Sequence, residues 1–581
     1  MSYLWAAAFF PLALAFLFLQ GVREEKRRKA RLHERFVRME GKPPAARNGA
    51  GCIPDGYLRT LHPGFAIDTI TWNDLEMDAV FRRLDYTQSQ AGREYLYACL
   101  HCPAAREAEA ARWDGVVSYF LSHSGQRVAV QMLLAETGSE KEMDFHHCLA
   151  GMERMAARRP AGEYAALAAY ILAVLCMAWS GGVGFCLLSG VIIFQVITYF
   201  RRRAGMLPYL RMIAWLLRMI RSMEKLYRVL EPAVCVETER NLHMDLRACI
   251  GKLRVLRRRS FWVMQNGTEN RGPFAMIGDY IRMLFHVDLI QFASLQGRIL
   301  SLQSEIREAY ACMGYVDSCI SIAMYRLSLQ RYCIPRLYHR NENTDGAADQ
   351  TDLSGGGGLY AVDCVHPLLE NPVPNSNAMK AGRGILLTGS NASGKSTFLQ
   401  TVAVNLLLSQ TIHTALADHF SAPFCRLYTA MADGKGRSGD IRTGESSYMA
   451  EILSLKRVLD AGKNAPVPVF CFVDEILRGT GTVERIAASA CILKAIRPPR
   501  MFCFAATHDR ELTRLLAGVY DSYYFSEEIT DGDMRFPYRL LPGVSQTGNA
   551  IRLLKAVGYD SEIVEGASRQ AAAFVREGVW K

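Results

Sequence analysis

Gly389-Ser390-Asn391-Ala392-Ser393-Gly394-Lys395-Ser396-Thr397 is the stretch that decides the fold of the C-terminal part of this 581-residue chain. It matches the pattern Gly-x-x-x-x-Gly-Lys-Ser/Thr, directly after an apolar run at residues 385–388 and directly before a helical run at residues 397–410. A glycine-rich turn between a strand and a helix attracts anions, because its backbone N–H groups and the helix N-terminus point at the same place. The stretch therefore predicts an α/β domain that binds phosphate groups.

The pattern also assigns a role to individual residues. We expect the backbone of residues 389–394 to surround the phosphates of ATP and Lys395 to reach the β- and γ-phosphates. The hydroxyl of Ser396 is expected to ligate Mg²⁺, and Thr397 completes the nucleotide-binding set.

Two further apolar runs end in polar residues that suit hydrolysis. Residues 469–473 lead into Asp474 and Glu475, and such carboxylates are costly to bury without a partner. We predict that Asp474 holds Mg²⁺, directly or through water, and that Glu475 positions or deprotonates the attacking water. Residues 501–506 lead into Thr507 and His508. His508 either contacts the γ-phosphate as part of the catalytic set or has a structural role.

Two uncharged apolar segments predict membrane spans. Residues 2–20 precede a basic cluster, whereas a cleaved signal peptide has its basic residues first. Residues 164–200 are long enough for two slightly short spans joined at Ser180-Gly181-Gly182, since roughly 20 helical residues cross a bilayer. Arginines flank this hairpin on both sides, which places its ends in the cytoplasm. The alternative is that both segments are buried helices of a large soluble core.

These segments divide the chain into parts that we expect to differ in environment. In chain order they are a transmembrane anchor at 1–21, a basic juxtamembrane segment at 22–71, a helical part at 72–160, a transmembrane hairpin at 164–200, further helices at 204–338, a glycine-rich linker at 339–358 and the α/β domain at 359–581. The expected location is the cell membrane, with several spans, membrane lipid as a partner and the α/β domain in the cytoplasm.

Cysteine usage and net charge narrow the range of locations and binding partners that the sequence allows. The 16 cysteines are scattered, several of them inside apolar segments, which is typical of a reduced cytoplasm. Cys99 and Cys102 form one Cys-x-x-Cys pair without a second pair at a zinc-ligand spacing, so we interpret it as helix surface. The net charge of +11 suits nucleic acid or anionic lipid, and the membrane flanks already account for a good share of it.

A series of motifs runs from residue 366 to residue 558. They are His366-Pro367-Leu368-Leu369-Glu370, Asn375, the phosphate-binding stretch, Gly444-Glu445-Ser446-Ser447-Tyr448-Met449-Ala450-Glu451, Asp474-Glu475-Ile476-Leu477-Arg478-Gly479-Thr480-Gly481-Thr482, Ala506-Thr507-His508, Glu511-Leu512, Leu541-Pro542-Gly543-Val544-Ser545 and the helix at 550–558. In their order and spacing these motifs resemble the MutS family. A weaker resemblance to the start of the MutS core domain covers Asp74-Leu75-Glu76, Asp85, Thr87, Gly92, Leu96 and Pro103.

The resemblance implies an α/β P-loop NTPase domain of the ABC and MutS type, preceded by an all-α core and lever domain with transmembrane helices. It implies an ATPase that uses Mg²⁺ and works as a homodimer through its ATPase domains. In such a dimer Ser446 would reach the γ-phosphate bound by the other subunit. It also implies a DNA-associated function related to mismatch repair, with double-stranded DNA held through phosphate contacts by basic helices at 211–228 and 252–259.

Three departures from the family pattern change this expectation. Nothing before Trp72 is long enough for a mismatch-reading domain, and the segment at 164–200 interrupts the helices that lead to the DNA clamp in relatives. Pro372-Val373-Pro374 stands where many relatives place an aromatic residue that stacks on adenine. We therefore expect a membrane-anchored variant without the mismatch-recognition domain. The alternative is a nucleotide-driven membrane switch or scaffold for a protein partner that does not bind DNA.

Overall fold

The structure divides into two units that interleave along the sequence. The computed structural model describes residues 2–44, 54–61, 63–138, 144–155, 161–230, 247–248, 250–256, 280–281, 283–339, 358–379, 382–390, 393–431, 447–463, 465–478, 480–496, 501–530, 533–544, 551, 554 and 558–577. Unit 1 comprises Met1–His62, Leu84–Ala98 and Asp114–Ser328, and unit 2 comprises Pro63–Arg83, Cys99–Trp113 and Leu329–Lys581. Unit 2 thus contains two segments from the first 113 residues besides the C-terminal part expected to begin at residue 359.

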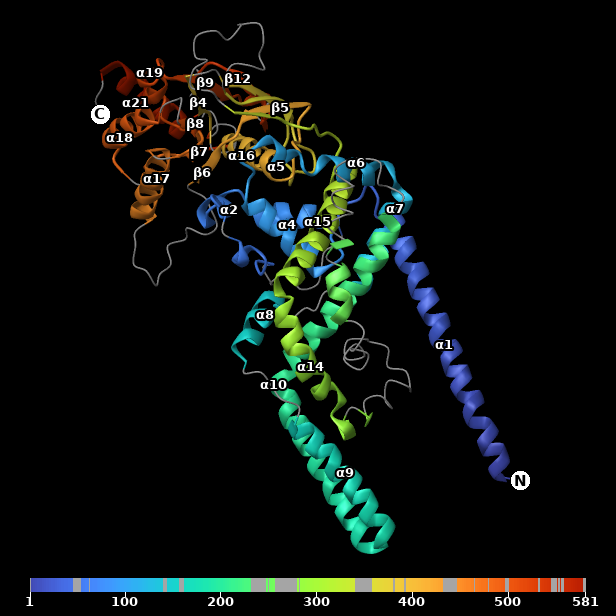
Figure 1. Ribbon diagram of the computed structural model, residues 1–581. Coiled ribbons are helices and arrows are strands. Elements are labelled where there is room, and N and C mark those ends of the chain that lie inside the picture. The colour runs from blue at the N-terminus through green and yellow to red at the C-terminus, as the bar shows by residue number, and fades with distance from the viewer. Residues whose placement is uncertain are drawn as a thin grey trace. The chain divides into compact units, whose positions relative to one another are not determined.

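All the secondary-structure elements described in unit 1 are helices (Figure 1). Its elements are α1 (Ser2–Arg38), the 3₁₀ turn η1 (Leu58–Thr60), α6 (Asp114–Ser122), α7 (Ser124–Thr137), α8 (Phe145–Arg154), α9 (Ala161–Trp179), α10 (Gly181–Leu230), α14 (Val287–Ser301) and α15 (Gln303–Ser328). Helices α3 (Met77–Leu84) and α4 (Gln90–His101) cross the division between the units.

Helix α10 is longer than the sequence suggests. We expected an apolar segment that ends at residue 200 and a separate basic helix after it, whereas α10 runs through both, with Pro208 inside it. Proline has no N–H to donate to the carbonyl of residue 204, so one helical hydrogen bond is lost there. The second half of α10 packs on α7 and buries Ile213, Trp215 and Ile220.

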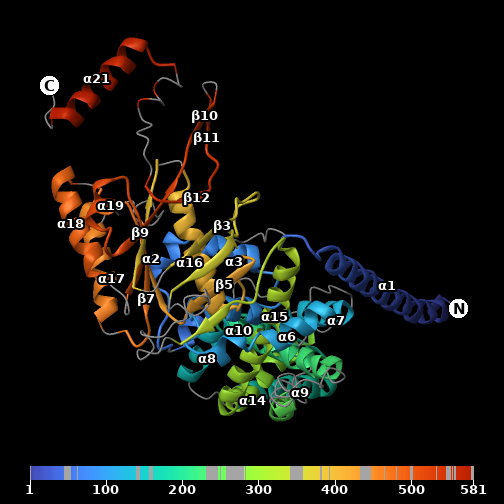
Figure 2. The same ribbon diagram turned by 90° about the horizontal axis from the view of Figure 1, so that it is seen from above.

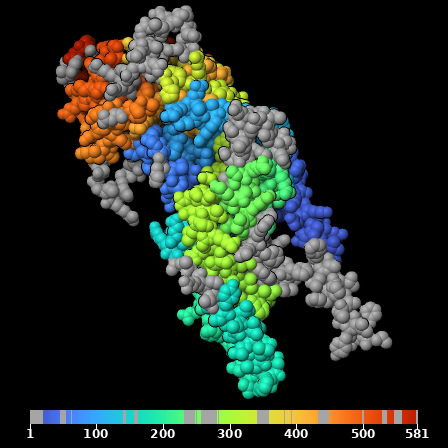
Figure 3. Space-filling model, viewed as in Figure 1, coloured from blue at the N-terminus to red at the C-terminus, as the bar shows by residue number. Residues whose placement is uncertain are grey.

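Helix α9 and the first part of α10 form an antiparallel hairpin (Figures 1 and 3). Both helices are long and apolar enough to cross a membrane by length and composition. Their large apolar side chains are mostly exposed, as at Leu172 (63%), Phe185 (64%) and Phe194 (65%). The described residues thus leave an apolar surface that water does not favour. The other expected span, residues 2–20, forms part of α1, but most of its side chains lie outside the described set.

A buried carboxylate fixes the start of α4 in unit 1. Asp317, on α15, accepts hydrogen bonds from the backbone N–H groups of Gln88 (3.0 Å) and Ser89 (2.7 Å) and from the Ser89 hydroxyl (2.6 Å). Hydrogen bonds of this kind satisfy N–H groups that a helix N-terminus leaves open, and a negative charge there is favourable. The side chain of Asp317 thereby joins two helices that are far apart in sequence.

Unit 2 is built around a six-stranded sheet in the order β12-β9-β4-β8-β7-β6. The strands are parallel except β12, which runs antiparallel to β9. A four-stranded sheet in the order β1-β5-β2-β3 and a β10-β11 hairpin complete the set. The strands are β1 (Arg336–Tyr338), β2 (Tyr360–Cys364), β3 (Asn375–Ala378), β4 (Gly384–Thr388), β5 (His419–Pro423), β6 (Arg426–Ala430), β7 (Val469–Asp474), β8 (Met501–Ala506), β9 (Tyr520–Phe525), β10 (Glu528–Thr530), β11 (Asp533–Arg535) and β12 (Leu540–Pro542).

Helices cover both faces of the six-stranded sheet (Figure 2). They are α2 (Thr69–Asp74), α16 (Lys395–Thr411), α17 (Ser447–Lys463), α18 (Thr482–Ala495) and α19 (Glu511–Leu515). Unit 2 also contains α5 (Glu107–Ala111), which packs on α16, and α21 (Ser561–Glu577). Alternate residues of β7 point to opposite faces: Cys471 joins the core under α17 and α18, whereas Phe470 and Phe472 stack on their β8 neighbours at 4.8 and 5.1 Å. Burial on both faces explains why the strands are continuous apolar runs.

The early segments of unit 2 are held by buried polar contacts. The carboxylate of Asp74, at the end of α2, accepts hydrogen bonds from the Thr429 hydroxyl (2.7 Å) and the Met431 N–H (3.1 Å) after β6. The Asp74 carbonyl accepts from the Gln400 amide of α16 at 2.9 Å. Trp113 donates its indole N–H to the Thr411 carbonyl at the end of α16 (2.8 Å). These segments therefore belong to the core of unit 2.

Unit 1 contains two buried titratable groups whose pKa values move in opposite directions. Burial raises the pKa of Glu94 to about 7 and lowers the pKa of His146 to about 4. Glu94 Oε2 lies 3.6 Å from His146 Nε2, but between pH 4 and pH 7 both groups are mainly neutral, so this contact is not an ion pair. The aromatic rings of Tyr57 and Tyr310 surround them.

We predict that Glu94→Gln stabilises unit 1 at alkaline pH. A carboxyl group with a raised folded-state pKa contributes stability below its unfolded pKa near 4.5, and that stability is lost as the pH rises through about 7. The neutral amide avoids this loss. The variant should match the wild type at pH 5 and exceed it at pH 8 by up to roughly 3 kcal/mol.

The measurement is the thermal unfolding of detergent-purified protein at the two pH values. Glu308→Gln, which removes an exposed carboxylate from α15, is the matched control and should show no such pH-dependent gain. Equal midpoints for Glu94→Gln and the wild type at pH 8 would show that Glu94 ionises in the folded chain without cost.

Candidate functional site

The register of three parallel strands brings the expected site residues to one edge of the sheet. Leu387 of β4 and Asp474 of β7 both pair with Ala506 of β8, so these strands end at the same level. The phosphate-binding loop follows β4, Glu475 follows β7 and His508 follows β8. The carboxyl ends of parallel strands in an open sheet form the usual ligand-binding edge of such domains.

The glycines of the loop are required by its backbone. Gly389 has φ of 143°, and a Cβ there would lie 2.8 Å from the Ser393 hydroxyl and 3.1 Å from the Phe525 carbonyl oxygen. Gly394 has φ of 104° at the N-terminus of α16. Both values lie in a region that side-chain-bearing residues rarely adopt. The turn can therefore bring α16, with its positive N-terminal end, directly behind the loop.

Lys395 is folded back onto its own loop. Its ammonium donates hydrogen bonds to the carbonyl oxygens of Gly389 (2.8 Å) and Ser390 (2.6 Å). The residue is 3% exposed, and burial lowers the pKa of this lysine, although Asp474 and Glu475 act in the opposite direction. An ammonium has three N–H groups, and these two carbonyl oxygens accept from two of them. Phosphate oxygens would have to replace the carbonyls to use those two donors.

Glu475 is held by two cationic or proton-donating side chains. His508 Nε2 lies 2.6 Å from Glu475 Oε1, and Arg478 lies 2.9 Å from Oε2. The His508 hydrogen bond and the nearby positive charges lower the pKa of Glu475 despite its partial burial. Glu475 has φ of 50°, so its backbone sits in the sparsely populated left-handed region.

The contacts of His508 settle where its proton lies. Nε2 is 3.4 Å from the Lys395 ammonium, which only donates, and 2.6 Å from a carboxylate, which only accepts. One nitrogen cannot serve both, and the shorter contact indicates that Nε2 carries the proton and donates to Glu475. His508 is thereby placed beside both Lys395 and Glu475, which favours its expected role in the site over a purely structural one.

Ser396 and Asp474 offer oxygen atoms that suit Mg²⁺. Ser396 lies in the first turn of α16 next to Lys395, and Asp474, 6% exposed, ends β7 close enough to raise the lysine pKa. Mg²⁺ prefers hard oxygen ligands and keeps waters and phosphate oxygens besides one or two protein groups. In the described residues no group of three or more His, Cys, Asp or Glu side chains gathers, so a metal here would depend on such added ligands.

A cavity of about 320 Å³ lies beside the loop and fits the place expected for the base. Pro372, Val373, Thr397 and Tyr538 are among the residues that line it. Sequence reasoning expected no aromatic residue here and missed Tyr538, which comes from a segment far along the chain. Asn375 fixes that segment: its amide donates to the Tyr538 carbonyl (2.9 Å), and its side-chain oxygen accepts from the Leu540 N–H (2.7 Å).

Two more polar contacts shape the loops around Glu475 and His508. The carboxylate of Glu451 on α17 accepts a hydrogen bond from the Leu477 N–H. Arg485 on α18 makes a paired contact with Asp509, at 2.9 and 2.7 Å. Their only sequence signal was position, since Glu451 ends the motif at residues 444–451 and Asp509 directly follows His508. The loop residues thus depend on α17 and α18 for their positions.

Three expected site residues lie outside the described residues. They are Asn391 and Ala392 of the loop and Ser446, and their roles stay predictions. Helix α17 begins at Ser447, directly after the third of them.

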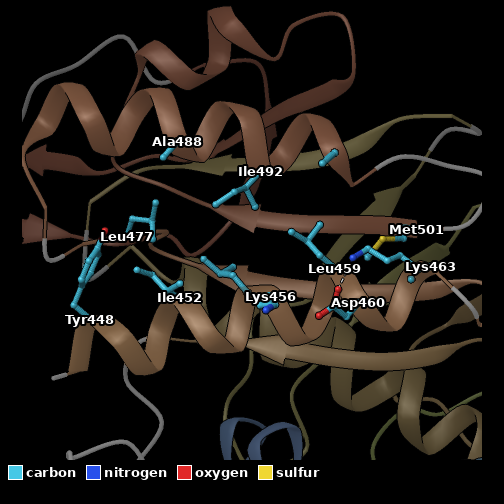
Figure 4. A pocket seen from close by; sticks show the side chains of 13 residues that line it. Tyr448, Ile452, Lys456, Leu459, Asp460, Lys463, Leu477, Ala488, Ile492 and Met501 are labelled. Atoms are coloured by element: carbon cyan, nitrogen blue, oxygen red, sulfur yellow. Dashed lines mark hydrogen bonds and ion pairs between the residues drawn. The ribbon is translucent and has the colours of Figure 1, made fainter. Parts of the chain in front are cut away.

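An apolar groove of about 740 Å³ lies away from the loop, between α17 and α18 (Figure 4). Tyr448, Ile452, Leu459 and Ile492 point into it, with Lys456 and Asp460 at its edge. It contains none of the expected catalytic residues, so volume is a poor guide to the site in this domain.

Taken together, the fold and the site define a P-loop nucleotide-binding domain. Residues 385–575 match the family described as MutS domain V. A DNA mismatch repair protein MutS of Thermus thermophilus is 31% identical over 219 residues, which cover 37% of this chain and 26% of that protein. The MutS proteins of Natronomonas pharaonis (26% over 286 residues; 48% and 30%) and Carboxydothermus hydrogenoformans (24% over 305 residues; 50% and 33%) are also similar.

This chain thus carries, at residues 385–575, a domain that matches the MutS family. The matched part spans only about a quarter to a third of the length of these relatives.

We predict that Lys395→Ala and Glu475→Gln separate binding from hydrolysis. Loss of the ammonium should weaken ATP binding, because the β- and γ-phosphates lose their main charge partner. Glu475→Gln should keep binding and slow hydrolysis by roughly two to four orders of magnitude, if this carboxylate activates the water. Nucleotide-binding titrations and phosphate release measure the two effects. Normal turnover by Glu475→Gln would remove this residue from the mechanism.

Proposed function

We propose that this chain is an ATPase that binds ATP and Mg²⁺ at the edge formed by β4, β7 and β8. The observation that carries the proposal is the position of His508, 3.4 Å from the Lys395 ammonium and 2.6 Å from the Glu475 carboxylate, directly behind a glycine-rich loop. Lys395 and the loop amides would bind the phosphates, and Ser396 and Asp474 would hold the metal. Mg²⁺ would neutralise charge on the phosphates during transfer to water.

The contacts without nucleotide indicate what binding must change. The phosphates would take the Lys395 donors from the Gly389 and Ser390 carbonyls, which moves the ammonium toward the ligand. Glu475 would need a carboxylate oxygen directed at water, whereas both of its oxygens now contact His508 and Arg478. We infer that His508 turns from Glu475 to the γ-phosphate. Glu475 would then act as the base, and His508 would donate a hydrogen bond to the transferred phosphoryl group.

The chain would work as a homodimer through its ATPase domains, with Ser446 completing the site of the other copy. Ser446 directly precedes α17, and a helix N-terminus is a favourable place for the γ-phosphate. The Glu451–Leu477 contact would carry a movement of α17 to the loop that holds Glu475. In the alternative reading Ser446 only caps its own helix, which is worth about 1 kcal/mol and does not respond to nucleotide.

Mixing two inactive variants tests the shared site. Lys395→Ala spoils one subunit's loop, and Ser446→Arg spoils what a subunit donates to its partner. A mixed dimer retains one good loop facing one intact Ser446, so the mixture should recover ATPase activity in proportion to the mixed dimers formed. The readout is phosphate release, with dimer formation checked by light scattering. Inactive mixtures that still dimerise, or normal activity of Ser446→Arg alone, would rule out sharing.

The membrane part of the proposal places the α9–α10 hairpin in the bilayer and unit 2 in the cytoplasm. The apolar length of both helices, their exposed side chains and the flanking arginines 201–203 support it. The expected anchor at residues 2–20 would add a third span.

The similar MutS proteins are named for DNA mismatch repair, which makes double-stranded DNA the first candidate ligand. The basic helices expected to contact phosphates already pair with carboxylates: Lys225 with Glu136 at 2.6 Å, and Arg254 with Glu224 at 3.4 Å. These pairings favour the second candidate, a nucleotide-driven membrane switch that binds a protein. Exposed pairs are weak, typically about 0–1 kcal/mol, so DNA phosphates can compete for them at low salt.

A salt titration separates the two candidates. If DNA is the ligand, the logarithm of its binding constant should fall with log salt by about 0.9 per phosphate contact, and Arg254→Gln should lower that slope. Fluorescence anisotropy on the detergent-purified chain, with and without ATP, gives the slope. Arg569→Gln is the control, because Arg569 lies on α21, far from Arg254 in the sequence. No binding at low salt in either nucleotide state would leave the membrane switch as the function.

A further inference from the structure

The α9–α10 hairpin carries a groove of about 670 Å³ along one face. Small residues of α9 form one wall, and α10 forms the other. The wall of α9 is Gly162, Ala165, Ala166 and Ala169, and that of α10 includes Val183, Leu187, Gly190, Val191 and Phe194. In a bilayer, helices associate through close packing at small residues and through interhelical hydrogen bonds, because lipid gives no hydrophobic drive between them. The shape of the groove therefore suits another helix.

Gly190 marks the open part of the groove. A Cβ built on this residue would meet no atom of the chain within 4 Å among the described residues. The glycine is thus not needed for packing between α9 and α10. Glycine weakens a helix by roughly 0.5–1 kcal/mol relative to alanine, so its presence in the middle of an apolar helix calls for a reason. Close approach of a helix from outside the hairpin is such a reason.

Gln195 gives the groove a polar point. The residue is 2% exposed and lines the groove, and its amide nitrogen donates one hydrogen bond to the Ala166 carbonyl at 2.7 Å. Its side-chain oxygen has no hydrogen-bond partner among the described residues. A primary amide has two N–H groups, so one N–H and the oxygen are unpaired among these residues. Such groups are costly to leave without partners in an apolar medium. Because the side chain is almost fully buried, it must turn toward the groove to reach another molecule.

Polar contacts hold the base of the hairpin, beside the groove, in place. His286 Nδ1 lies 2.6 Å from Glu163 Oε2, and Arg202 lies 2.6 Å from the other oxygen of Glu163. His286 Nε2 lies 3.1 Å from the Gln195 carbonyl oxygen. These contacts tie both helices to the start of α14, so the groove is a formed feature of unit 1.

We propose that the groove binds the hairpin of a second copy of this chain, with the Gln195 amides of the two copies paired across a two-fold axis. The remaining N–H of each amide donates to the oxygen of the other. The donor and acceptor left by Gln195 are complementary to themselves, as an interface between identical copies requires. The acyl chains of a lipid offer neither a donor nor an acceptor, which makes them a poorer partner for this amide.

This inference rests on the proposed membrane insertion and on the proposed dimer, and it adds a contact that does not need nucleotide. The full chain is labelled with one dye and reconstituted into phosphatidylcholine and phosphatidylglycerol liposomes at low density without ATP. Counting photobleaching steps gives the dimer fraction. Sedimentation after a carbonate wash of the same sample reports membrane insertion separately.

We expect wild-type chains to show two steps. Gly190→Leu places a side chain in the groove from a position where a Cβ meets no other atom of the described residues within 4 Å, and Gln195→Leu removes the amide pair. Each should raise the dissociation constant about tenfold, since interhelical hydrogen bonds in membranes are worth about 0.6–1.7 kcal/mol each. Gly182→Leu, at a glycine that is also open but outside the groove, is the matched control and should dimerise like the wild type. ATP binding by Gly190→Leu verifies folding.

Carbonate-resistant chains that dimerise equally well with Leu at 190 or 195 would overturn the inference and leave the membrane anchor standing. Single-step wild-type particles that become dimers only with ATP would overturn it in favour of contact through the ATPase domains alone. Loss of a co-purified lipid from Gly190→Leu at an unchanged dimer fraction, seen by native mass spectrometry, would assign the groove to lipid. Extraction of the chain by carbonate would refute membrane insertion itself.

Discussion

The shared level at which β4, β7 and β8 end is the constraint on which the site depends. Each strand supplies one element from its last residues, namely the loop with Lys395, the carboxylates at 474–475 and His508. A shift of one residue in either pairing would turn the alternating side chains of a strand over and move its functional residue to another level. The stacked phenylalanines of β7 and β8 on one face and the core under α17 and α18 on the other resist such a shift.

The loop after β7 concentrates backbone strain where the chemistry is expected. Glu475 and Leu477 both have positive φ, at 50° and 57°, which costs a non-glycine residue of order 1–3 kcal/mol. The hydrogen bond from the Leu477 N–H to Glu451 and the burial of the Leu477 side chain hold this conformation. Because a contact from α17 holds this loop, a movement of α17 would also move the loop. Helix α17, which provides Glu451, is therefore well placed to control the orientation of the Glu475 carboxylate.

Local sequence was sufficient to predict the parts of the site that form from neighbouring residues. The strands at 385–388, 469–473 and 501–506 and the helix after Gly394 are present, because glycine-rich turns and long apolar runs carry their structure with them. Tyr538 and Arg478 were not assigned roles, since the first approaches the loop only through the tertiary contact with Asn375 and the second through its side-chain conformation. The place of residues 63–83 and 99–113 in unit 2 depends on contacts hundreds of residues away, which no periodicity reports.

That interleaving has a consequence for synthesis on the ribosome. Trp113 meets its partner Thr411 298 residues later, so at about 5–20 residues per second the indole waits roughly 15–60 s before its hydrogen bond can form. Asp74 waits longer, for Thr429 and Met431. During this interval α2 lacks β6 and α5 lacks α16, the elements on which they pack, and the apolar hairpin emerges in between. The nascent chain thus exposes unpacked surface ahead of its apolar hairpin until the sheet of unit 2 has been synthesised, and transiently exposed apolar surface favours aggregation.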